Sequence, residues 1–187
     1  MGENVLLEMR GICKSFSGVP ALNNVEIELK AGEVHALLGE NGAGKSTLIK
    51  ILAGIYQKDA GEIRLDGTPV EITSASDAKN LGISVMHQEI SLVPQLSVAN
   101  NILLGKEGKS FFIDYKKRRE IARKAMEELG YDINVDTMVE DLSIAQQQIV
   151  EIVRALTAEE TKLIVMDEPT AAISEKDVEK LFETIRR

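Results

Sequence analysis

The fold is decided by a nine-residue stretch, Gly39-Glu40-Asn41-Gly42-Ala43-Gly44-Lys45-Ser46-Thr47. It matches the phosphate-binding loop pattern, in which two glycines enclose four residues and precede Lys and then Ser or Thr. Glycines let the backbone approach phosphate oxygens closely, and successive N–H groups at a helix amino terminus point toward negative charge. The ammonium of Lys45 adds a mobile cation, and the hydroxyl of Ser46 is a ligand for Mg²⁺. The stretch predicts a phosphate-binding site; a plain glycine-rich turn before a helix is the structural alternative.

The residues on either side of this stretch supply the context that the pattern requires. Residues 34–38 form an apolar run typical of a strand, and residues 45–53 carry apolar side chains at helical spacing. Gly54 is the expected carboxyl cap, because glycine adopts the left-handed backbone at low cost. The helix is predicted to bury three side chains on one face: Leu48, Ile51 and Leu52.

Further strands are predicted in the first third of the chain. Short runs with turn signals place them at residues 5–9, 24–29 and 62–65. The third run is followed by Asp66-Gly67, a pair that favours a tight turn. His35 lies among apolar neighbours in the run before the loop, so we expect a core histidine rather than a ligand.

The middle of the chain, about residues 91–161, is predicted to be helical. Its clearest element, residues 115–129, has an apolar face formed by Ile121, Ala122, Ala125, Met126 and Leu129. Glutamates balance the basic run 116–119, which favours a solvated face over an anionic partner. A later helix, residues 174–185, is expected to begin at a Ser174 cap and to carry Val178, Leu181, Phe182 and Ile185 at helical spacing.

Two adjacent carboxylates follow a second apolar run. Residues 163–166 are typical of a strand buried on both faces of a parallel sheet, and Asp167 and Glu168 come directly after it. Open parallel sheets bind ligands at this end of their strands. Beside a phosphate loop, Asp167 is expected to hold Mg²⁺ through water and Glu168 to polarise the attacking water, which favours hydrolysis. Without such a loop, an acidic pair after a strand is more often a helix cap.

Three further motifs narrow the class. A GTPase is expected to carry an Asn-Lys-x-Asp base-reading motif, and the sequence has none. It has instead Val85-Met86-His87-Gln88-Glu89 between the first two motifs, Leu142-Ser143-Ile144-Ala145-Gln146 before the acidic strand, and Glu168-Pro169-Thr170 after it. In this order the five motifs resemble the ATP-binding domain of ABC transporters over essentially the whole chain.

The resemblance implies an α/β fold: a P-loop NTPase core with a mainly parallel sheet, an amino-terminal antiparallel β region and an inserted α-helical subdomain. It implies one ATP-binding domain over residues 1–187, with the nucleotide-binding core in 1–90 and 162–187 and the helical subdomain in about 91–161. ATP and Mg²⁺ are the implied ligands. We expect the domain to continue beyond Arg187, because the family places a histidine that contacts the γ-phosphate after the next strand.

The resemblance also implies roles outside the loop. Phe16 falls where the family stacks an aromatic ring on adenine, with a core phenylalanine as the alternative. Gln88 corresponds to the glutamine that touches Mg²⁺ and the attacking water near the transmembrane partner, and we interpret His87 as packing. Glu168, Gln88 and Lys45 form the expected catalytic set, while Ser46, Gln88 and Asp167 form the expected metal ligands.

The segment from Leu142 to Gln146 departs from the family's usual Leu-Ser-Gly-Gly-Gln signature. Leu142, Ser143 and Gln146 match it, but Ile144 and Ala145 replace both glycines. Side chains there restrict the close backbone approach to the γ-phosphate held by the opposing domain. The following run, Gln146-Gln147-Gln148, is similar to the sugar-importer branch of the ribose, galactose and xylose type, where this element is commonly irregular. Ser174 similarly stands where many members have an aspartate.

The composition argues against several other classes. A net charge of −8 opposes non-specific binding to nucleic acid or anionic lipid. No run approaches the roughly 18 uncharged apolar residues of a membrane helix, and the first residues lack a secretion signal. The single cysteine, Cys13, has only two histidines as companions and no zinc-ligand spacing. A reducing, cytoplasmic setting fits these features.

We therefore expect an importer motor that couples ATP hydrolysis to monosaccharide uptake. Its implied partners are a second ABC ATP-binding domain, paired head to tail and carried in the same full-length chain, and membrane permease subunits that hold it at the cytoplasmic face. A sugar-binding protein is an indirect partner, and no nucleic acid is expected. The alternatives are a soluble ABC ATPase, against which the acidic charge argues, and a regulatory nucleotide binder, against which Glu168 argues.

Overall fold

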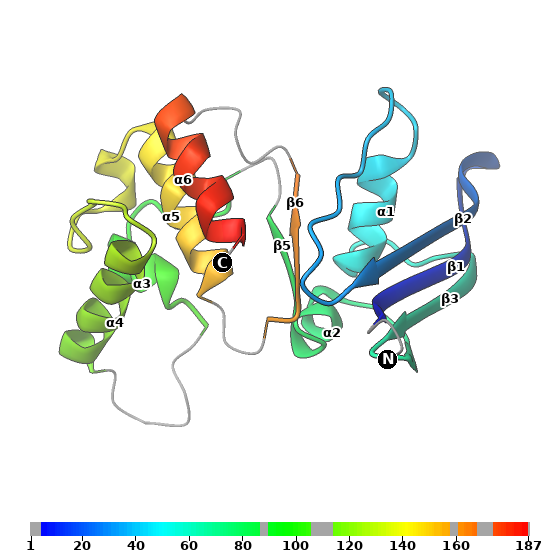
Figure 1. The fold of residues 1–187 in the computed structure, drawn as a ribbon, viewed down its shortest axis with the longest axis horizontal. Coiled ribbons are helices and arrows are strands. Elements are labelled where there is room, and N and C mark those ends of the chain that lie inside the picture. The colour runs from blue at the N-terminus through cyan, green and yellow to red at the C-terminus, as the bar shows by residue number, and fades with distance from the viewer. Residues whose placement is uncertain (1–4, 87–89, 106–113, 158–160, 168–173, 187) are drawn as a thin grey trace. The chain divides into compact units, whose positions relative to one another are not determined.

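The computed structural model of the chain describes residues 5–86, 90–105, 114–157, 161–167 and 174–186 (Figure 1). Two positions of the expected site, Gln88 and Glu168, lie outside these residues. The chain divides into two units, Met1–Ser84 and Val85–Arg187, and each is described by itself.

The first unit contains an antiparallel sheet with the strand order β2-β1-β3-β4 (Figure 1). Its strands are β1 (Val5–Phe16), β2 (Val19–Lys30), β3 (Ala60–Leu65) and β4 (Thr68–Val70). Leu7 of the central β1 pairs with Leu29 of β2 and with Leu65 of β3, so apolar side chains of the three strands share one face. The strands predicted at residues 5–9, 24–29 and 62–65 lie in this sheet. The tight turn predicted after the third strand joins β3 to β4.

Helix α1 (Lys45–Leu52) follows the glycine-rich stretch and buries its three predicted side chains. It ends in a Schellman motif, in which the Ile55 N–H donates to the Lys50 carbonyl at 2.9 Å and the Gly54 N–H donates to the Ile51 carbonyl at 3.0 Å. Gly54 has a φ of +69°, which confirms the predicted cap. A Cβ atom on Gly54 would lie 2.1 Å from the Ser74 carbonyl oxygen, so a larger residue does not fit.

Replacing Gly54 with Ala should lower the free energy of unfolding by about 2 kcal/mol or more, because the overlap with Ser74 adds to the cost of a left-handed residue. Gly67→Ala is the matched control. Its φ is +72°, and nothing lies within 4 Å of the added Cβ, so only the backbone cost of about 1 kcal/mol is expected. Urea denaturation of both variants measures the difference. Equal losses would contradict the close approach of Gly54 to Ser74.

The strand predicted at residues 34–38 does not form. Residues 33–40 carry no strand pairing in the described part of the chain, and Val34 and Leu38 are 69% and 88% exposed. An apolar run of this length becomes a strand only where a neighbouring strand pairs with it and covers it. The prediction used only the pattern of side chains, and it was wrong because no strand in the described residues pairs with this run.

The environment of His35 follows from that exposed backbone, and the prediction of a core histidine was also wrong. The imidazole is exposed, and its Nδ1 lies 3.0 Å from Oε1 of Glu33. The Lys30 N–H, which donates to the Glu33 carboxylate, lowers the pKa of that carboxyl, and His35 lowers it further. His35 is therefore a surface partner of a carboxylate.

Strands β5 (Ile83–Met86) and β6 (Leu163–Met166) form a separate, parallel two-stranded sheet. The second unit adds α3 (Val98–Ile102), α4 (Tyr115–Glu128), the 3₁₀ helix η1 (Val139–Asp141), α5 (Ile144–Leu156) and α6 (Glu175–Arg186), and the first unit adds α2 (Ala75–Asn80). Leu163 is buried, but the rest of β6 is only partly buried, because β5 is its one neighbour among the described strands.

The helices of the second unit enclose an apolar core. Residues of α3, α4 and α5 contribute to it, among them Ile102, Met126 and Val150, which are fully buried. The amphipathic helix predicted at 115–129 is confirmed as α4, although Ile121 points away from the core and is exposed. The Ser174 hydroxyl accepts a hydrogen bond from the Asp177 N–H at 3.3 Å, which confirms the expected start of α6.

Candidate phosphate-binding site

The glycine-rich loop is held in a conformation that demands glycine at its end. Gly44 has a φ of +90°, and a Cβ there would lie 2.7 Å from both the Ala21 carbonyl oxygen and Cδ2 of Leu22. The loop therefore approaches β2 without a side chain between them. Gly42 also has a positive φ, of +85°, but the space beside its Cα is open. That opening leaves the backbone accessible to a ligand.

The side chain of Lys45 folds back across the loop. Its Nζ donates to the carbonyl oxygens of Gly39 at 2.7 Å and of Glu40 at 2.9 Å. The Ala43 N–H donates to the Glu40 carbonyl at 3.2 Å, which closes a turn within the same loop. The ammonium is thus held at the loop by weakly basic carbonyl groups, which phosphate oxygens can replace with stronger, charge-assisted hydrogen bonds.

The amino terminus of α1 fits an anion. Among the described residues no side chain caps this end, and its first turn contains no acidic residue. The first N–H groups of a helix have no partner within it and carry partial positive charge. Ser46, in that turn, is exposed, and Thr47 is half-buried. The uncapped turn, the open loop and Lys45 together make a site whose donors suit phosphate groups.

Phe16 lies at the end of β1 in the same unit. Its ring is 39% exposed and meets the ring of Tyr56 edge to face, with the centroids 5.0 Å apart. Lys14 Nζ lies 5.6 Å from the Phe16 ring centre and donates to the Asp59 carboxylate at 2.7 Å. That hydrogen bond lowers the pKa of Asp59, as does the donating Ser15 N–H. The exposure argues against a core role for Phe16, and its role toward adenine stays a prediction.

Tyr56 was not among the predicted site residues. The sequence signal for it is weak, because a tyrosine two residues beyond a helix cap has many uses. Its place beside Phe16 depends on the Schellman turn, in which the Tyr56 N–H donates to the Lys50 carbonyl at 3.1 Å. Lys50 Nζ also lies 5.4 Å from the Tyr56 ring centre. The aromatic pair therefore joins the end of β1 to the end of α1.

The segment 142–146 forms the start of α5, within the region predicted to be helical. The Ser143 hydroxyl accepts from the Gln146 N–H at 3.3 Å, and Oε1 of Gln146 accepts from the Ser143 N–H at 3.0 Å, which makes a capping box. Leu142 is buried beneath it, whereas Ile144 is 66% exposed. The two polar side chains that match the family signature thus hold the helix end, and an apolar side chain projects where a glycine is usual.

The acidic end of β6 is described only in part. The Asp167 N–H donates to the Met86 carbonyl at 3.1 Å, which carries the pairing of β5 and β6 one residue beyond Met166. Asp167 is half-buried, in the second unit, while Ser46 belongs to the first. Gln88 and Glu168, the other expected ligand and the expected base, lie outside the described residues. No group of three His, Cys, Asp or Glu side chains within the described ranges is arranged to hold a metal ion.

Comparison with known proteins decides the family. The family model of ABC transporters matches residues 22–171, which include the loop, the start of α5 and the acidic strand. The chain belongs to the ABC transporter family. Phe16 and Ser174 fall outside the matched range of this ABC transporter chain, so the match gives their predicted roles no direct support.

Individual relatives of this ABC transporter chain agree with that assignment. A ribose import ATP-binding protein of Rubrobacter xylanophilus is 54% identical over 183 residues, which are 97% of this chain and 36% of that protein. The crystal structure of a nucleotide-free ATP-binding cassette from an ABC transporter covers 97% of this chain and 76% of its own, with a TM-score of 0.83 at 28% identity. These structural matches confirm the predicted α/β fold.

A third relative adds information about nucleotide and assembly. It is an ATP-binding cassette solved as a dimer in a post-hydrolysis state, bound to ADP and phosphate. It covers 95% of this chain and 80% of its own, with a TM-score of 0.81 at 25% identity. The chain spans about a third of the length of the curated relatives it matches.

Proposed function

We propose that this chain is part of the ATP-binding and ATP-hydrolysing motor of a bacterial monosaccharide importer. The observation that carries the proposal is the combination of Lys45, the open loop at Gly42 and the uncapped amino terminus of α1. These groups converge within one unit and suit the phosphates of ATP. The names of relatives such as the ribose import protein support a sugar as the transported substrate, although those proteins are much longer than this chain.

We assign the following roles to the residues of the site. The loop amides and the Lys45 ammonium bind the phosphate groups, and Phe16 offers an exposed ring for the adenine. Ser46, Asp167 and Gln88 would hold Mg²⁺, whose charge offsets that of the phosphate oxygens when it is bound. The hydroxyl of Ser46 and the carboxylate of Asp167 are oxygen ligands of the kind that Mg²⁺ prefers. Glu168 would orient and polarise the attacking water.

We also propose the domain boundaries given by the sequence. Residues 1–90 and 162–187 form the nucleotide-binding core, and about 91–161 form the helical subdomain. Support comes from the apolar core between Leu92 and Val153, to which α3, α4 and α5 contribute. Such a subdomain would present the capping box at Ser143 to a second ATP-binding domain.

The proposed partners follow from that arrangement. A second ATP-binding domain would complete the site, as the dimer of the ADP-bound relative suggests by its assembly. Permease subunits would hold the motor at the cytoplasmic face of the membrane and receive sugar from a binding protein. No helix within the described residues is long and apolar enough to cross a membrane. Purification of the tagged natural protein together with a permease would support these partners. Its recovery in a complex that contains no membrane protein would favour the soluble ATPase.

The 187-residue chain should bind ATP in the presence of Mg²⁺ but hydrolyse it weakly, because one domain supplies only part of the catalytic geometry. Dilution provides the test. If a second copy completes the site, specific ATPase activity should rise with protein concentration, whereas bound ATP per chain should not. Glu168→Gln measured in parallel corrects for contaminating ATPases. Rapid turnover that is independent of concentration and lost in Glu168→Gln would contradict the paired-site proposal.

A further inference from the structure

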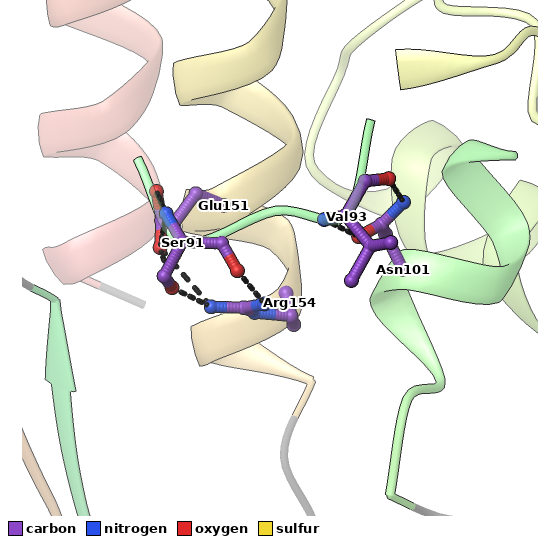
Figure 2. A network of polar contacts seen from close by, with 5 residues as sticks. All are labelled: Ser91, Val93, Asn101, Glu151 and Arg154. Carbon is purple, nitrogen blue, oxygen red and sulfur yellow. Dashed lines mark hydrogen bonds and ion pairs between the residues drawn. The ribbon is translucent and has the colours of Figure 1, made fainter. Parts of the chain in front are cut away.

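A buried carboxylate lies in the apolar run of α5. The Glu151 side chain is 5% exposed, between neighbours that belong to the core. Its Oε1 accepts hydrogen bonds from the Ser91 hydroxyl at 2.6 Å and from the Ser91 N–H at 3.2 Å (Figure 2). Nη2 of Arg154, one turn further along α5, donates to the same oxygen at 3.0 Å. The carboxylate is thus paired and hydrogen-bonded, as burial of a charge requires.

Arg154 also donates hydrogen bonds to Ser91. Its Nη2 donates to the Ser91 hydroxyl at 2.5 Å, and its Nη1 donates to the Ser91 carbonyl at 3.2 Å (Figure 2). The N–H, the carbonyl and the hydroxyl of Ser91 are therefore all bound by two side chains of α5. These contacts join residues about sixty positions apart in the chain. They fix the position of one short segment on one helix.

The segment after Ser91 is fixed from a second side. Asn101 of α3 is fully buried; its Oδ1 accepts from the Val93 N–H at 2.7 Å, and its Nδ2 donates to the Val93 carbonyl at 3.0 Å (Figure 2). The same Nδ2 lies 3.2 Å from the carbonyl oxygens of Leu96 and Ser97. This clamp is local, because it holds residues only four to eight positions away. It shapes the segment, whereas Glu151 and Arg154 attach it to α5.

Each end of this arrangement is close in the sequence to a residue expected at the site. Ser91 follows Gln88 by three residues in the sequence. Glu151 follows Ser143, the first residue of the α5 capping box, by eight residues, or about 12 Å along the helix axis. Helix α5 thus carries the capping box at its amino terminus and, about two turns later, the side chains that bind Ser91.

We propose that Glu151 is a positioning residue that couples α5 to the segment that begins at Ser91, with Arg154 and Ser91 as its partners. A displacement of α5 caused by a nucleotide at the capping-box end is transmitted through Glu151 to the backbone at Ser91. Glu151 touches no nucleotide itself. The inference rests on the proposed function, since it requires that ATP turnover depends on both ends.

A contribution to stability alone does not explain the network of Glu151, Arg154 and Ser91. Desolvation of a buried carboxylate and guanidinium offsets much of their attraction, and well-packed apolar side chains of similar volume are often as stable. The three polar atoms of Ser91 are matched one by one, which defines the position of the segment more sharply than apolar packing would. The network therefore suits transmission of a position better than it suits stabilisation.

The experiment uses the complete natural subunit assembled with its permease. Glu151→Gln keeps the shape but removes the charge, and Ser91→Ala removes only the hydroxyl. Each should lower kcat for ATP about tenfold and leave KM for ATP within about twofold, because the phosphate loop is untouched. The double variant should be no slower than the slower single variant, because both act through one contact. Asn101→Ala is the control, since it removes buried hydrogen bonds to the same segment but none to α5.

Asn101→Ala should lower the unfolding midpoint at least as much as Glu151→Gln, yet change kcat less than about threefold. The inference is overturned if kcat follows the unfolding midpoint across all variants, if the two single effects multiply in the double variant, or if Ser91→Ala turns over at the wild-type rate. Lys45→Ala, measured alongside, tests the proposed function separately. Full turnover in Lys45→Ala would refute the ATPase assignment, whereas loss there with normal Glu151→Gln turnover would refute only the positioning role.

Discussion

Lys45→Ala should weaken the binding of ATP with Mg²⁺ by at least about a hundredfold, which places it beyond detection by calorimetric titration of the 187-residue chain. Nζ of Lys45 donates two hydrogen bonds to loop carbonyls, at Gly39 and Glu40. We expect phosphate oxygens to replace those carbonyls when ATP binds. Each hydrogen bond to a charged group contributes about 1.5–3 kcal/mol, so losing two corresponds to a factor of about 100 or more.

The matched control for this prediction is Lys50→Ala. It removes the same charge from the same helix, but Lys50 lies in the last turn of α1, where its ammonium faces the Tyr56 ring. Lys50→Ala should change affinity less than about threefold. Equal affinities of the wild type and Lys45→Ala would refute the assignment of the loop, and equal losses in both variants would show that only net charge matters.

The parts of the fold that were predictable depend on local rules. The start of α1 follows from the glycine-rich pattern, and its end follows from Gly54, whose left-handed backbone and contact with Ser74 exclude larger residues. Ser174 was recognisable as the cap of α6 for the same reason. In each case the residues that decide the structure lie within one or two turns of it.

The predictions that failed needed information from elsewhere in the chain. Residues 34–38 have the apolar pattern of a strand, but a strand also needs a paired neighbour, and none pairs with them in the described ranges. His35 became an exposed partner of Glu33 for the same reason. Ile121 shares the helical spacing of Ala122 and Ala125 but lies at the margin of their face, where it stays exposed. Spacing alone does not define the width of a buried face.

The hydrogen-bond partners of the buried polar residues could not be predicted from the sequence for a different reason. Glu151 interrupts an apolar run, so the sequence marks it as unusual, but its partner Ser91 lies about sixty residues away. Nothing in the helical period predicts that pairing. Asn101 similarly lies in a short helix, and its function depends on a backbone segment that curls around it. Such contacts are defined by tertiary structure.

The irregular segment 142–146 gives rise to the last prediction, because its own geometry separates two effects. Ser143 and Gln146 cap α5, so this end of the helix is well formed without the usual glycines. In the proposed head-to-tail pair, the signature of the other domain would cover ATP bound at Lys45 and Ser46, while Ser143 and the exposed Ile144 would face the other domain's nucleotide. The missing glycines should therefore weaken the partner site and leave the site built on residues 39–47 competent.

Glu168→Gln in the complete subunit with its permease should lower ATP turnover at least about a hundredfold, because it removes the proposed base from the competent site. Ser143→Arg should lower turnover less than about tenfold, because the site that it obstructs is already weak. Ser143→Ala separates obstruction from loss of the helix cap, which costs about 1 kcal/mol of stability. ATP turnover and sugar uptake are measured for all three variants. A larger loss in Ser143→Arg than in Glu168→Gln would refute the asymmetric pair, since the signature end of this chain would then control the stronger of the two sites.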